Sequence, residues 1–254
     1  MKIASWNINS LRKRLDRLMA WLEKAQPDIV CLQETKCTDE QFPLLALQAA
    51  GYHAAFHGEK SYNGVAILSK VAPEEVRTSL DQDAEDHQAR IVAASVSGLR
   101  IYSIYVPNGR AVGSPAYVYK LKWFDRLREC LARETSDNLV VAGDLNVAPE
   151  DVDVHDPELW RGAIMCSEEE RTALKKVLQV GLSDTLRLHH KEGGLFSWWD
   201  YRMLSFPKNR GLRIDAILAS ATLSKKCTDA GIDRGMRKGA EPSDHAPVWA
   251  EFAP

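Results

Sequence analysis

The chain has 254 residues, a hydrophobic content of 45% and a formal net charge of -2. This length is compatible with one large domain or two small ones, and the apolar content supports a sizeable core. No apolar run approaches the length of a transmembrane helix, and the net charge excludes a chain that is basic throughout.

The N-terminal part of the sequence predicts two strands and two helices. Residues 3–6 form a short apolar run that is typical of a strand. Ser10 is expected to cap a helix that ends before Pro27, because the apolar residues between them recur at helical spacing. A second strand is predicted at 28–32, and a second helix fits residues 39–50.

Short strand-like runs follow, without convincing helices between them. They lie at residues 52–56, 65–68, 76–80, 91–96 and 100–106. Asn63-Gly64 and Ser97-Gly98 are typical turn dipeptides. We therefore expect this segment to form a β-meander.

A long helix is predicted over residues 115–133, and it leads to the stretch NLVVAGDLNVAP at 138–149. The four apolar residues in this stretch are typical of a fully buried strand. Gly143 is expected to let the backbone turn, so that Asp144 and Asn146 lie just past the strand end.

The last third of the chain predicts one helix and three strands. A capping-box pattern at 167–170 predicts a helix to about residue 180, stopped by Gly181. Strands are predicted at 213–219, 227–233 and 245–252. Because no linker, repeat or low-complexity stretch divides the chain, we expect a single α/β domain over residues 1–254, with helices on the outer faces of its sheets.

Cysteine usage indicates a reducing compartment. Five cysteines, an odd number without a CxxC pair, are typical of reduced thiols and not of a disulfide framework or a zinc site. The first strand begins at Lys2, which leaves no room for a signal or transit peptide. We expect a cytoplasmic protein.

Charge is unevenly distributed along the chain. Acidic residues collect at 81–86 and 150–158, and basic residues at 12–17, 120–128, 202–213 and 234–238. Each run taken alone predicts a solvated face. The run at 202–213 is different, because it has four basic residues and no acids and follows a group of aromatic residues.

Polar residues recur where the predicted strands end or begin. They are Asn7 and Asn9, Gln33, Glu34 and Lys36, Tyr105 and Asn108, Asp144 and Asn146, Asp215, and Asp244 with His245. In a sheet with antiparallel pairs, the ends of some strands and the starts of others share one edge. We therefore expect these groups to converge on a single site.

The residue types at this site favour a hard cation. Carboxylate and amide oxygens with one histidine and no thiolate suit Mg²⁺ or Mn²⁺, whereas zinc would want more histidine or cysteine. Such a cation binds substrate phosphate, which indicates phosphoester chemistry. His245, with Asp215 as an orienting partner, has the features of a general base.

Seven motifs resemble the exonuclease III family of abasic-site endonucleases, part of the wider endonuclease, exonuclease and phosphatase superfamily. They are WNINSLR at 6–12, LQETK at 32–36, YVPNG at 105–109, GDLN at 143–146, FSWWDYR at 196–202, GLRID at 211–215 and SDHAPV at 243–248. The motifs run in family order and span nearly the whole chain. The resemblance implies a four-layer α/β sandwich, in which two mixed β-sheets pack face to face and helices cover the outer faces.

The same resemblance implies a DNA-repair hydrolase that uses Mg²⁺, with Mn²⁺ as a substitute. Its family cleaves the DNA backbone 5′ to abasic sites and usually has 3′ to 5′ exonuclease and 3′-phosphatase or phosphodiesterase activity. The implied substrate is double-stranded DNA with abasic sites or blocked 3′ ends. We expect the enzyme to act as a monomer and away from membranes.

The resemblance also implies a role for each matching position. The catalytic residues would be Tyr105, Asp144, Asn146, Asp215 and His245. The metal would be held or flanked by Asn7, Glu34, Asp144, Asn146, Asp244 and His245. Substrate contacts would come from Asn9, Arg12, Tyr62, Arg90, Asn108, Trp198, Arg202, Lys208, Arg210, Leu212 and Ile214. Whether Asp144 or His245 is the general base, and whether one or two metal ions bind, stays open at this stage.

Two features depart from the family pattern. The segments at 110–116 and 151–164 vary among members, which leaves the role of Arg110 open. Arg202 and Leu212 occupy positions where some relatives carry bulky apolar or aromatic residues, so the balance between abasic-site cleavage and exonuclease activity also stays open.

Two other classes of function fit part of the sequence. A phosphoesterase for small molecules would share the metal site, but it would have no need of a basic loop that follows aromatic residues. A DNA-binding module without activity would keep the basic face but lose catalytic residues, and none is missing from this sequence.

Overall fold

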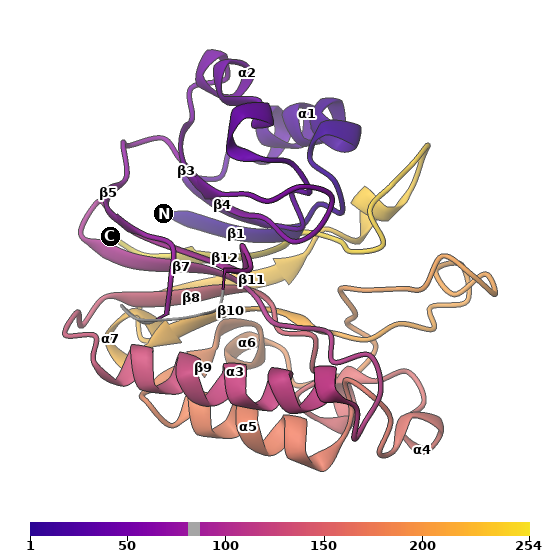
Figure 1. Ribbon diagram of the computed structural model, residues 1–254. Helices are drawn as coiled ribbons and strands as arrows, with labels where there is room; N and C mark the ends of the chain where they lie inside the picture. The colour runs from indigo at the N-terminus through magenta and orange to yellow at the C-terminus, as the bar shows by residue number, and fades with distance from the viewer. Residues whose placement is uncertain (81–86) are drawn as a thin grey trace.

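The computed structural model describes residues 1–80 and 87–254, which form two six-stranded sheets packed face to face between layers of helices (Figure 1). The strand order of the first sheet is β11-β12-β1-β2-β4-β3, and that of the second is β5-β6-β7-β8-β10-β9. Each sheet contains one parallel pair, β1 with β2 and β7 with β8, so both are mixed. The predicted four-layer α/β sandwich is confirmed.

The strands of the first sheet are β1 (Lys2–Asn7), β2 (Ile29–Gln33), β3 (His53–His57), β4 (Val65–Ser69), β11 (Cys227–Ile232) and β12 (Val248–Phe252). Those of the second sheet are β5 (Glu74–Arg77), β6 (Ile91–Val96), β7 (Leu99–Tyr105), β8 (Leu139–Asp144), β9 (Leu182–Asp184) and β10 (Asp215–Ser220). Apolar side chains from both sheets, such as Ile67 and Val140, form the core between them. Removing this apolar surface from water is the main force that holds the sheets together.

The helices cover the outer face of each sheet (Figure 1). Over the first sheet lie α1 (Leu15–Ala25) and α2 (Leu44–Ala49), which share a buried cluster with Trp6. Over the second lie α3 (Pro115–Ala132) and α5 (Glu168–Leu178). The short helices are α4 (Pro157–Trp160), α6 (Thr185–His189) and α7 (Ala221–Ser224). No helix of residues 1–80 or 87–254 is long and apolar enough to cross a membrane.

Local sequence rules explain several element ends. Ser167 and Glu170 form the predicted capping box at the start of α5. Ser97 and Gly98 have φ angles of 50° and 79°, which is the left-handed conformation that a tight hairpin between β6 and β7 requires.

Three local predictions were wrong, and a fourth is not tested. Ser10 has a φ of 86° and caps no helix, because a 3-10 turn at Arg12–Arg14 precedes α1. The helix predicted at 39–50 is interrupted because Pro43 keeps the preceding residue extended, which leaves a 3-10 turn and the short α2. The predicted meander is divided between the sheets, since β4 pairs with β2 and β3 in the first sheet, whereas β5, β6 and β7 belong to the second. The predicted acidic run at 81–86 lies outside the described residues.

Gly143 has a different role from the one predicted. It lies inside β8, where a Cβ atom would come within 1.9 Å of the Ile104 carbonyl oxygen. Glycine is required there because β7 approaches β8 closely. The left-handed residue that turns the chain beyond β8 is Asn146, with a φ of 49°.

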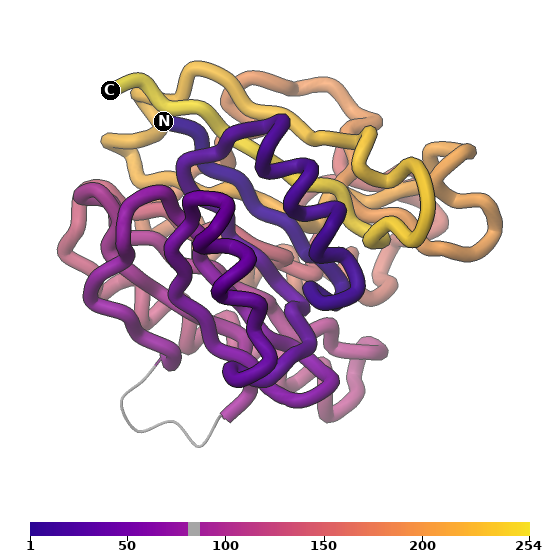
Figure 2. The backbone as a smooth tube through the Cα atoms, turned by 90° about the horizontal axis from the view of Figure 1, so that it is seen from above, coloured from indigo at the N-terminus to yellow at the C-terminus, as the bar shows by residue number. Residues whose placement is uncertain are grey.

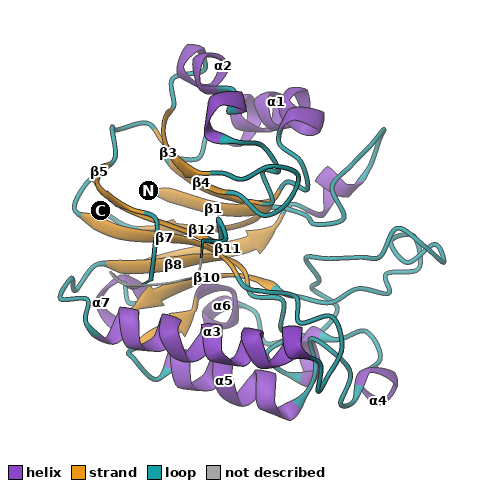
Figure 3. Cartoon of the chain, viewed as in Figure 1, coloured by secondary structure: helices purple, strands orange, loops and turns teal. Residues whose placement is uncertain are grey.

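The topology brings several strand ends to one edge of the sandwich. Because β7 is parallel to β8 and β10 is antiparallel to it, Tyr105 and Asp215 both lie opposite Asp144 in the register. Figure 3 shows long loops leaving this edge, while Figure 2 shows the two ends of the chain side by side. The loops at this edge carry most of the polar residues that the sequence singled out.

Candidate active site

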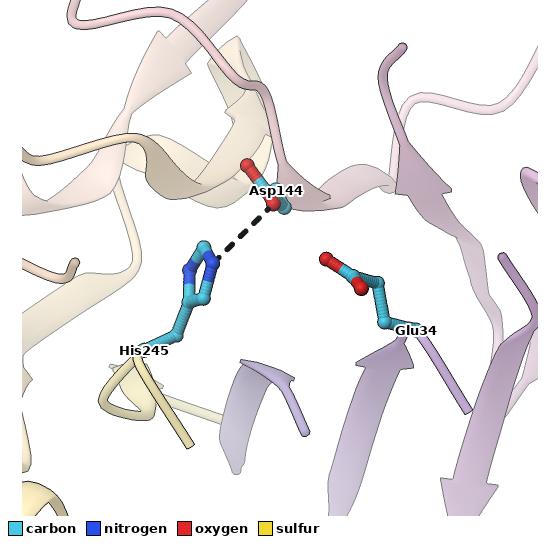
Figure 4. A group of neighbouring side chains, drawn as sticks. All are labelled: Glu34, Asp144 and His245. Atoms are coloured by element: carbon cyan, nitrogen blue, oxygen red, sulfur yellow. Dashed lines mark ion pairs between the residues drawn. The ribbon is translucent and has the colours of Figure 1, made fainter. Parts of the chain in front are cut away.

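A compact group of side chains that could hold a metal ion, called the metal-binding group below, lies at the shared strand edge. Glu34 follows β2, Asp144 ends β8 and His245 precedes β12. Each offers one ligand atom, and these atoms all lie within 4.8 Å of one another. Figure 4 shows the three side chains pointing toward a common space. The site therefore contains the carboxylates and imidazole that the sequence predicted.

Asn7 joins the two carboxylates of this group. Its side-chain amide donates to Glu34 Oε1 at 2.7 Å and to Asp144 Oδ2 at 2.9 Å. Glu34 has a φ of 51°, a left-handed conformation that is uncommon for a residue with a side chain. Strained backbone of this kind persists where surrounding contacts hold it and is frequent at functional sites.

His245 lies between two aspartates. Its Nδ1 is 2.8 Å from Asp215 Oδ2, and its Nε2 is 3.7 Å from Asp144 Oδ2 (Figure 4 draws the second contact). All three side chains are buried. Asp215 thus fixes the orientation of the imidazole, as predicted from the sequence, and leaves Nε2 facing Asp144.

The charges in this cluster alter its protonation. Burial alone would lower the pKa of His245, but the carboxylates of Asp215 and Asp144 raise it above its ordinary value. Burial raises the pKa of Asp144, and the negative charge of Asp215 adds to this rise. Burial, followed by the nearby Glu34 and Asp144 carboxylates, also raises the pKa of the Tyr105 hydroxyl. The favoured forms in the protein without metal or substrate are therefore a protonated imidazole at His245 and a neutral phenol at Tyr105.

Asn108 and Asn146 form a second polar group beside Asp144. The Asn146 main-chain nitrogen donates to Asp144 Oδ1 at 2.8 Å, and the Asn108 amide donates to Asn146 Oδ1 at 3.0 Å. The Asn146 amide in turn donates to the Val106 carbonyl oxygen at 2.9 Å. These bonds connect the loop after β7 to the loop after β8.

Both carboxylate oxygens of Asp244 accept hydrogen bonds from residues outside the group of Glu34, Asp144 and His245. Its two oxygens accept from Asn9 Nδ2 at 2.8 Å and from Trp198 Nε1 at 3.0 Å. Burial would raise the pKa of Asp244, but His245 and these two donors lower it on balance. The sequence prediction placed Asp244 among the metal residues, and the structure places it where it anchors Trp198.

The aromatic and basic loop at 196–213 is only partly as predicted. Arg213 counts among its four basic residues in the sequence, but its guanidinium is buried between Asp153 and Asp184, each at 2.6 Å. Arg202 is exposed and pairs with Asp200. Lys208 and Arg210 are exposed and have no ion pair with any residue in 1–80 or 87–254. They are the uncompensated charges of this loop.

The apolar residues expected around the damaged nucleotide lie deeper than expected. Leu212 and Ile214 are buried in a cluster with Met165 and Val154. Trp198 is half-buried at the edge of this cluster, whereas Trp199 is fully buried. Of these residues, Trp198 is the one that presents surface at the site.

The remaining predicted substrate contacts surround the site at its rim. Arg90 is half-buried, with its guanidinium 4.8 Å from the centre of the Tyr105 ring. Tyr62 is 71% exposed, and Arg12 and Arg110 are also exposed. The structure gives these last three no direct bond to the central group among the described residues.

Sequence reasoning gave no role to three residues that hold the site, although it counted Lys36 among the polar residues at strand ends. Lys36 Nζ lies 2.6 Å from Glu34 Oε2 and 2.7 Å from Asn9 Oδ1. Ser197 Oγ accepts from the Asp215 main-chain nitrogen at 3.1 Å, and Ser243 Oγ donates to the Asn7 carbonyl oxygen at 2.7 Å. Lys36 stands inside the LQETK motif, so its position was a usable signal. Ser197 and Ser243 also stand inside motifs, FSWWDYR and SDHAPV, but the motifs do not indicate which atoms the two hydroxyl groups bind.

The arrangement is suited to hydrolysis of a phosphoester. It combines carboxylates that can hold a hard cation, an imidazole oriented by an aspartate, and a tyrosine and amides at the rim. The group of Glu34, Asp144 and His245 contains no cysteine within the described residues. The chemistry favoured by these groups is attack by water on a phosphate.

Comparison with known proteins identifies relatives of the whole chain. The model of the endonuclease/exonuclease/phosphatase family matches residues 4–245. Exodeoxyribonuclease III of Haemophilus influenzae is 39% identical, covering 99% of this chain and all of that protein. The DNA repair nuclease APEX1 of Danio rerio is 32% identical, covering 98% of this chain and 81% of that protein.

Solved structures give the same picture. A 3′ phosphatase from Neisseria bound to a product DNA hairpin has a TM-score of 0.98 and 44% identity, with 100% of this chain and 99% of that one covered. An AP endonuclease from Archaeoglobus fulgidus has a TM-score of 0.96 and 39% identity, with both chains fully covered. The similarity extends over both sheets and all the loops at the site edge.

Proposed function

The chain belongs to the endonuclease/exonuclease/phosphatase family, and from this premise we propose that it is a DNA-repair nuclease that hydrolyses the DNA backbone 5′ to abasic sites. We further propose that it removes nucleotides and phosphate groups from 3′ ends. The observation that carries the proposal is the convergence of Glu34, Asp144 and His245 at one strand edge, in a chain that matches exodeoxyribonuclease III over its full length.

The residues at the site fit a divalent metal ion. Glu34 and Asp144 supply carboxylate oxygens, and Asn7 and Asn146 lie hydrogen-bonded beside them. Oxygen donors of this kind suit Mg²⁺, with Mn²⁺ as a substitute. A metal bound there would neutralise negative charge on the phosphate. Asp244 would support the site from outside through Asn9.

We assign the general base to Asp144 and the charge-stabilising role to His245. An imidazole whose pKa is raised by two carboxylates holds its proton and is a poor acceptor of another. Asp144 has a pKa raised toward neutrality, which favours it as the acceptor of a proton from water. His245, held by Asp215, would then donate its Nε2 proton toward a phosphate oxygen.

The rim residues would position the substrate. Tyr105, kept neutral, would donate its hydroxyl to the scissile phosphate, and Asn146 would orient the attacking water. Lys208, Arg210 and Arg12 are exposed cations that would bind the backbone of double-stranded DNA. Trp198 would line the pocket for the abasic sugar. We expect the protein to act as a monomer in the cytoplasm.

A phosphoesterase for small molecules is the second candidate, because superfamily members with this core include phosphatases. The exposed Lys208 and Arg210, in the loop that follows Trp198, favour the nuclease, since a small substrate would not need them. The two candidates differ in substrate and therefore in a simple assay.

The test uses the full chain, Mg²⁺ and an end-labelled duplex with one abasic site. The proposal expects a single cut 5′ to that site, trimming of an undamaged 3′ end, and loss of both in the presence of a chelator. A second duplex that ends in a 3′-phosphate should release inorganic phosphate. Intact duplexes, together with hydrolysis of a small phosphoester, would overturn the proposal in favour of the second candidate.

A further inference from the structure

A lysine outside the proposed mechanism is buried directly behind the site. Lys120 lies on the inward face of α3 among apolar residues such as Trp123 and Phe124. Its side chain has no exposed surface, and neither has that of its ion-pair partner Glu170 on α5. A buried charge is costly unless its donors are satisfied, so the question is what the ammonium group binds.

Two of the three acceptors of this ammonium group belong to site loops. It donates to the Glu170 carboxylate, to the Asn146 carbonyl oxygen at 2.7 Å and to the Asn108 carbonyl oxygen at 3.2 Å. An ammonium group has three N–H donors, so all of them are used. The lysine therefore binds the backbone of both asparagines that flank Asp144.

Glu170 is itself fixed, so that the lysine cannot move with its partner. One carboxylate oxygen accepts from the Met165 main-chain nitrogen at 3.1 Å. The other accepts from the Ser167 main-chain nitrogen at 3.1 Å, as part of the capping box of α5. Two helices and a loop thus define the position of the ammonium group.

The loops that it binds are in conformations that need support. Asn146 has a φ of 49°, a left-handed conformation that persists where its surroundings hold it. Gly109, with a φ of 87°, packs against the lysine stem, because a Cβ atom there would be 3.0 Å from Lys120 Cδ. The lysine stem packs against Gly109 in the loop after β7. The ammonium group binds the Asn146 carbonyl oxygen in the loop after β8.

We propose that Lys120 is a positioning residue of the nuclease reaction, which fixes the Asn108 and Asn146 side chains at the phosphate by binding their main-chain carbonyl oxygens. The inference rests on the proposed function, and it assigns to the buried ion pair a role that differs from stability alone. Lys120 touches no substrate and acts through Asn146, whose main-chain nitrogen also orients Asp144.

The test replaces the pair by neutral residues of similar size, Lys120→Met with Glu170→Gln. Changing both avoids an unpaired buried charge, which would threaten the fold. The kcat for the abasic duplex should fall by at least about tenfold, and KM should stay within about threefold, since misplaced catalytic groups lose rate more than affinity.

Glu134→Gln is the matched control, because Glu134 pairs with Arg77 and Arg100 at the opposite end of β7. It should lower Tm and leave kcat unchanged.

A double-mutant cycle separates positioning from stability. If Lys120 acts through Asn108 and Asn146, the tenfold loss should shrink below about threefold in an Asn108→Ala, Asn146→Ala background, because both side chains to be positioned are gone. Penalties that multiply in full would overturn the inference, and so would an unchanged kcat in the Lys120→Met, Glu170→Gln variant. A wild-type chain that cuts no DNA would instead overturn the proposed function together with this role.

Discussion

Replacing Asp215 by asparagine tests the core of the site with little change in shape. Asp215 Oδ2 lies 2.8 Å from His245 Nδ1, and both side chains are buried. A hydrogen bond to a charged group is worth about 1.5–3 kcal/mol, and 1.36 kcal/mol corresponds to one pH unit. Asp215→Asn should therefore lower the pKa of His245 by about one to two pH units, and loss of the oriented imidazolium should reduce kcat by about 10²- to 10⁴-fold.

The pH dependence of stability has a defined sign. The folded-state pKa of His245 is raised above its ordinary value of 6.5. The contribution of the protonated His245 side chain to the free energy of unfolding is therefore fully present below pH 6.5 and is lost as pH rises through the folded pKa. The destabilisation caused by Asp215→Asn should therefore be larger in mild acid than in alkali.

Three measurements check this prediction in metal-free and metal-loaded protein. NMR titration of the His245 ring protons gives its pKa, denaturant unfolding at several pH values gives the stability difference, and single-turnover cleavage gives the rate. Asp233→Asn is the control, since Asp233 accepts from the Trp21 ring nitrogen at 2.7 Å without belonging to the site. A variant with an unchanged His245 pKa and a kcat within about threefold of wild type would refute the reasoning.

Three further outcomes are expected. Glu34→Gln should abolish Mg²⁺-dependent cleavage with little loss of fold, because the amide keeps the shape and removes the charge; calorimetric Mg²⁺ binding equal to wild type would contradict this. DNA affinity should fall with salt at a log-log slope of about -0.9 per phosphate contact, and Lys208→Ala or Arg210→Ala should each reduce the slope by about one unit. A slope unaffected by both changes would place DNA elsewhere. Trp198→Ala should reduce kcat/KM for abasic-site cleavage more than for removal of a 3′-phosphate, since only the former needs the pocket filled. Equal losses on both substrates would make Trp198 a structural residue only.

Local patterns predicted most elements because the relevant contacts are local. Helical spacing gave α3 to within a residue, and the capping box gave the start of α5. The division of β3 and β4 from β5, β6 and β7 was missed because sheet membership depends on pairing with β2, which is remote in sequence. The residues within 52–106 do not indicate which of the two sheets each strand joins.

The site was predicted in outline because its members lie in motifs at strand ends. Two charged residues show why the rest was missed. Arg213 stands in a basic run and looked exposed, but Asp153 and Asp184 bury it. Lys120 at an inward helical position resembles any surface lysine until Glu170, fifty residues later, is placed beside it. Buried ion pairs join residues whose separation carries no periodic signal.

The placement of β12 has a consequence for biosynthesis. It pairs with β1 on one side and β11 on the other, so the first sheet cannot close before the last strand has been made. His245 lies just before β12, whereas Asn7 is the last residue of β1. The contacts between β12 and β1 join residues at opposite ends of the sequence. They form late in folding, because closing so long a loop costs conformational entropy before the contacts can stabilise the sheet. A nascent chain on the ribosome would therefore remain inactive until its final strand emerged, and cleavage of nucleic acid by unfinished copies would be avoided.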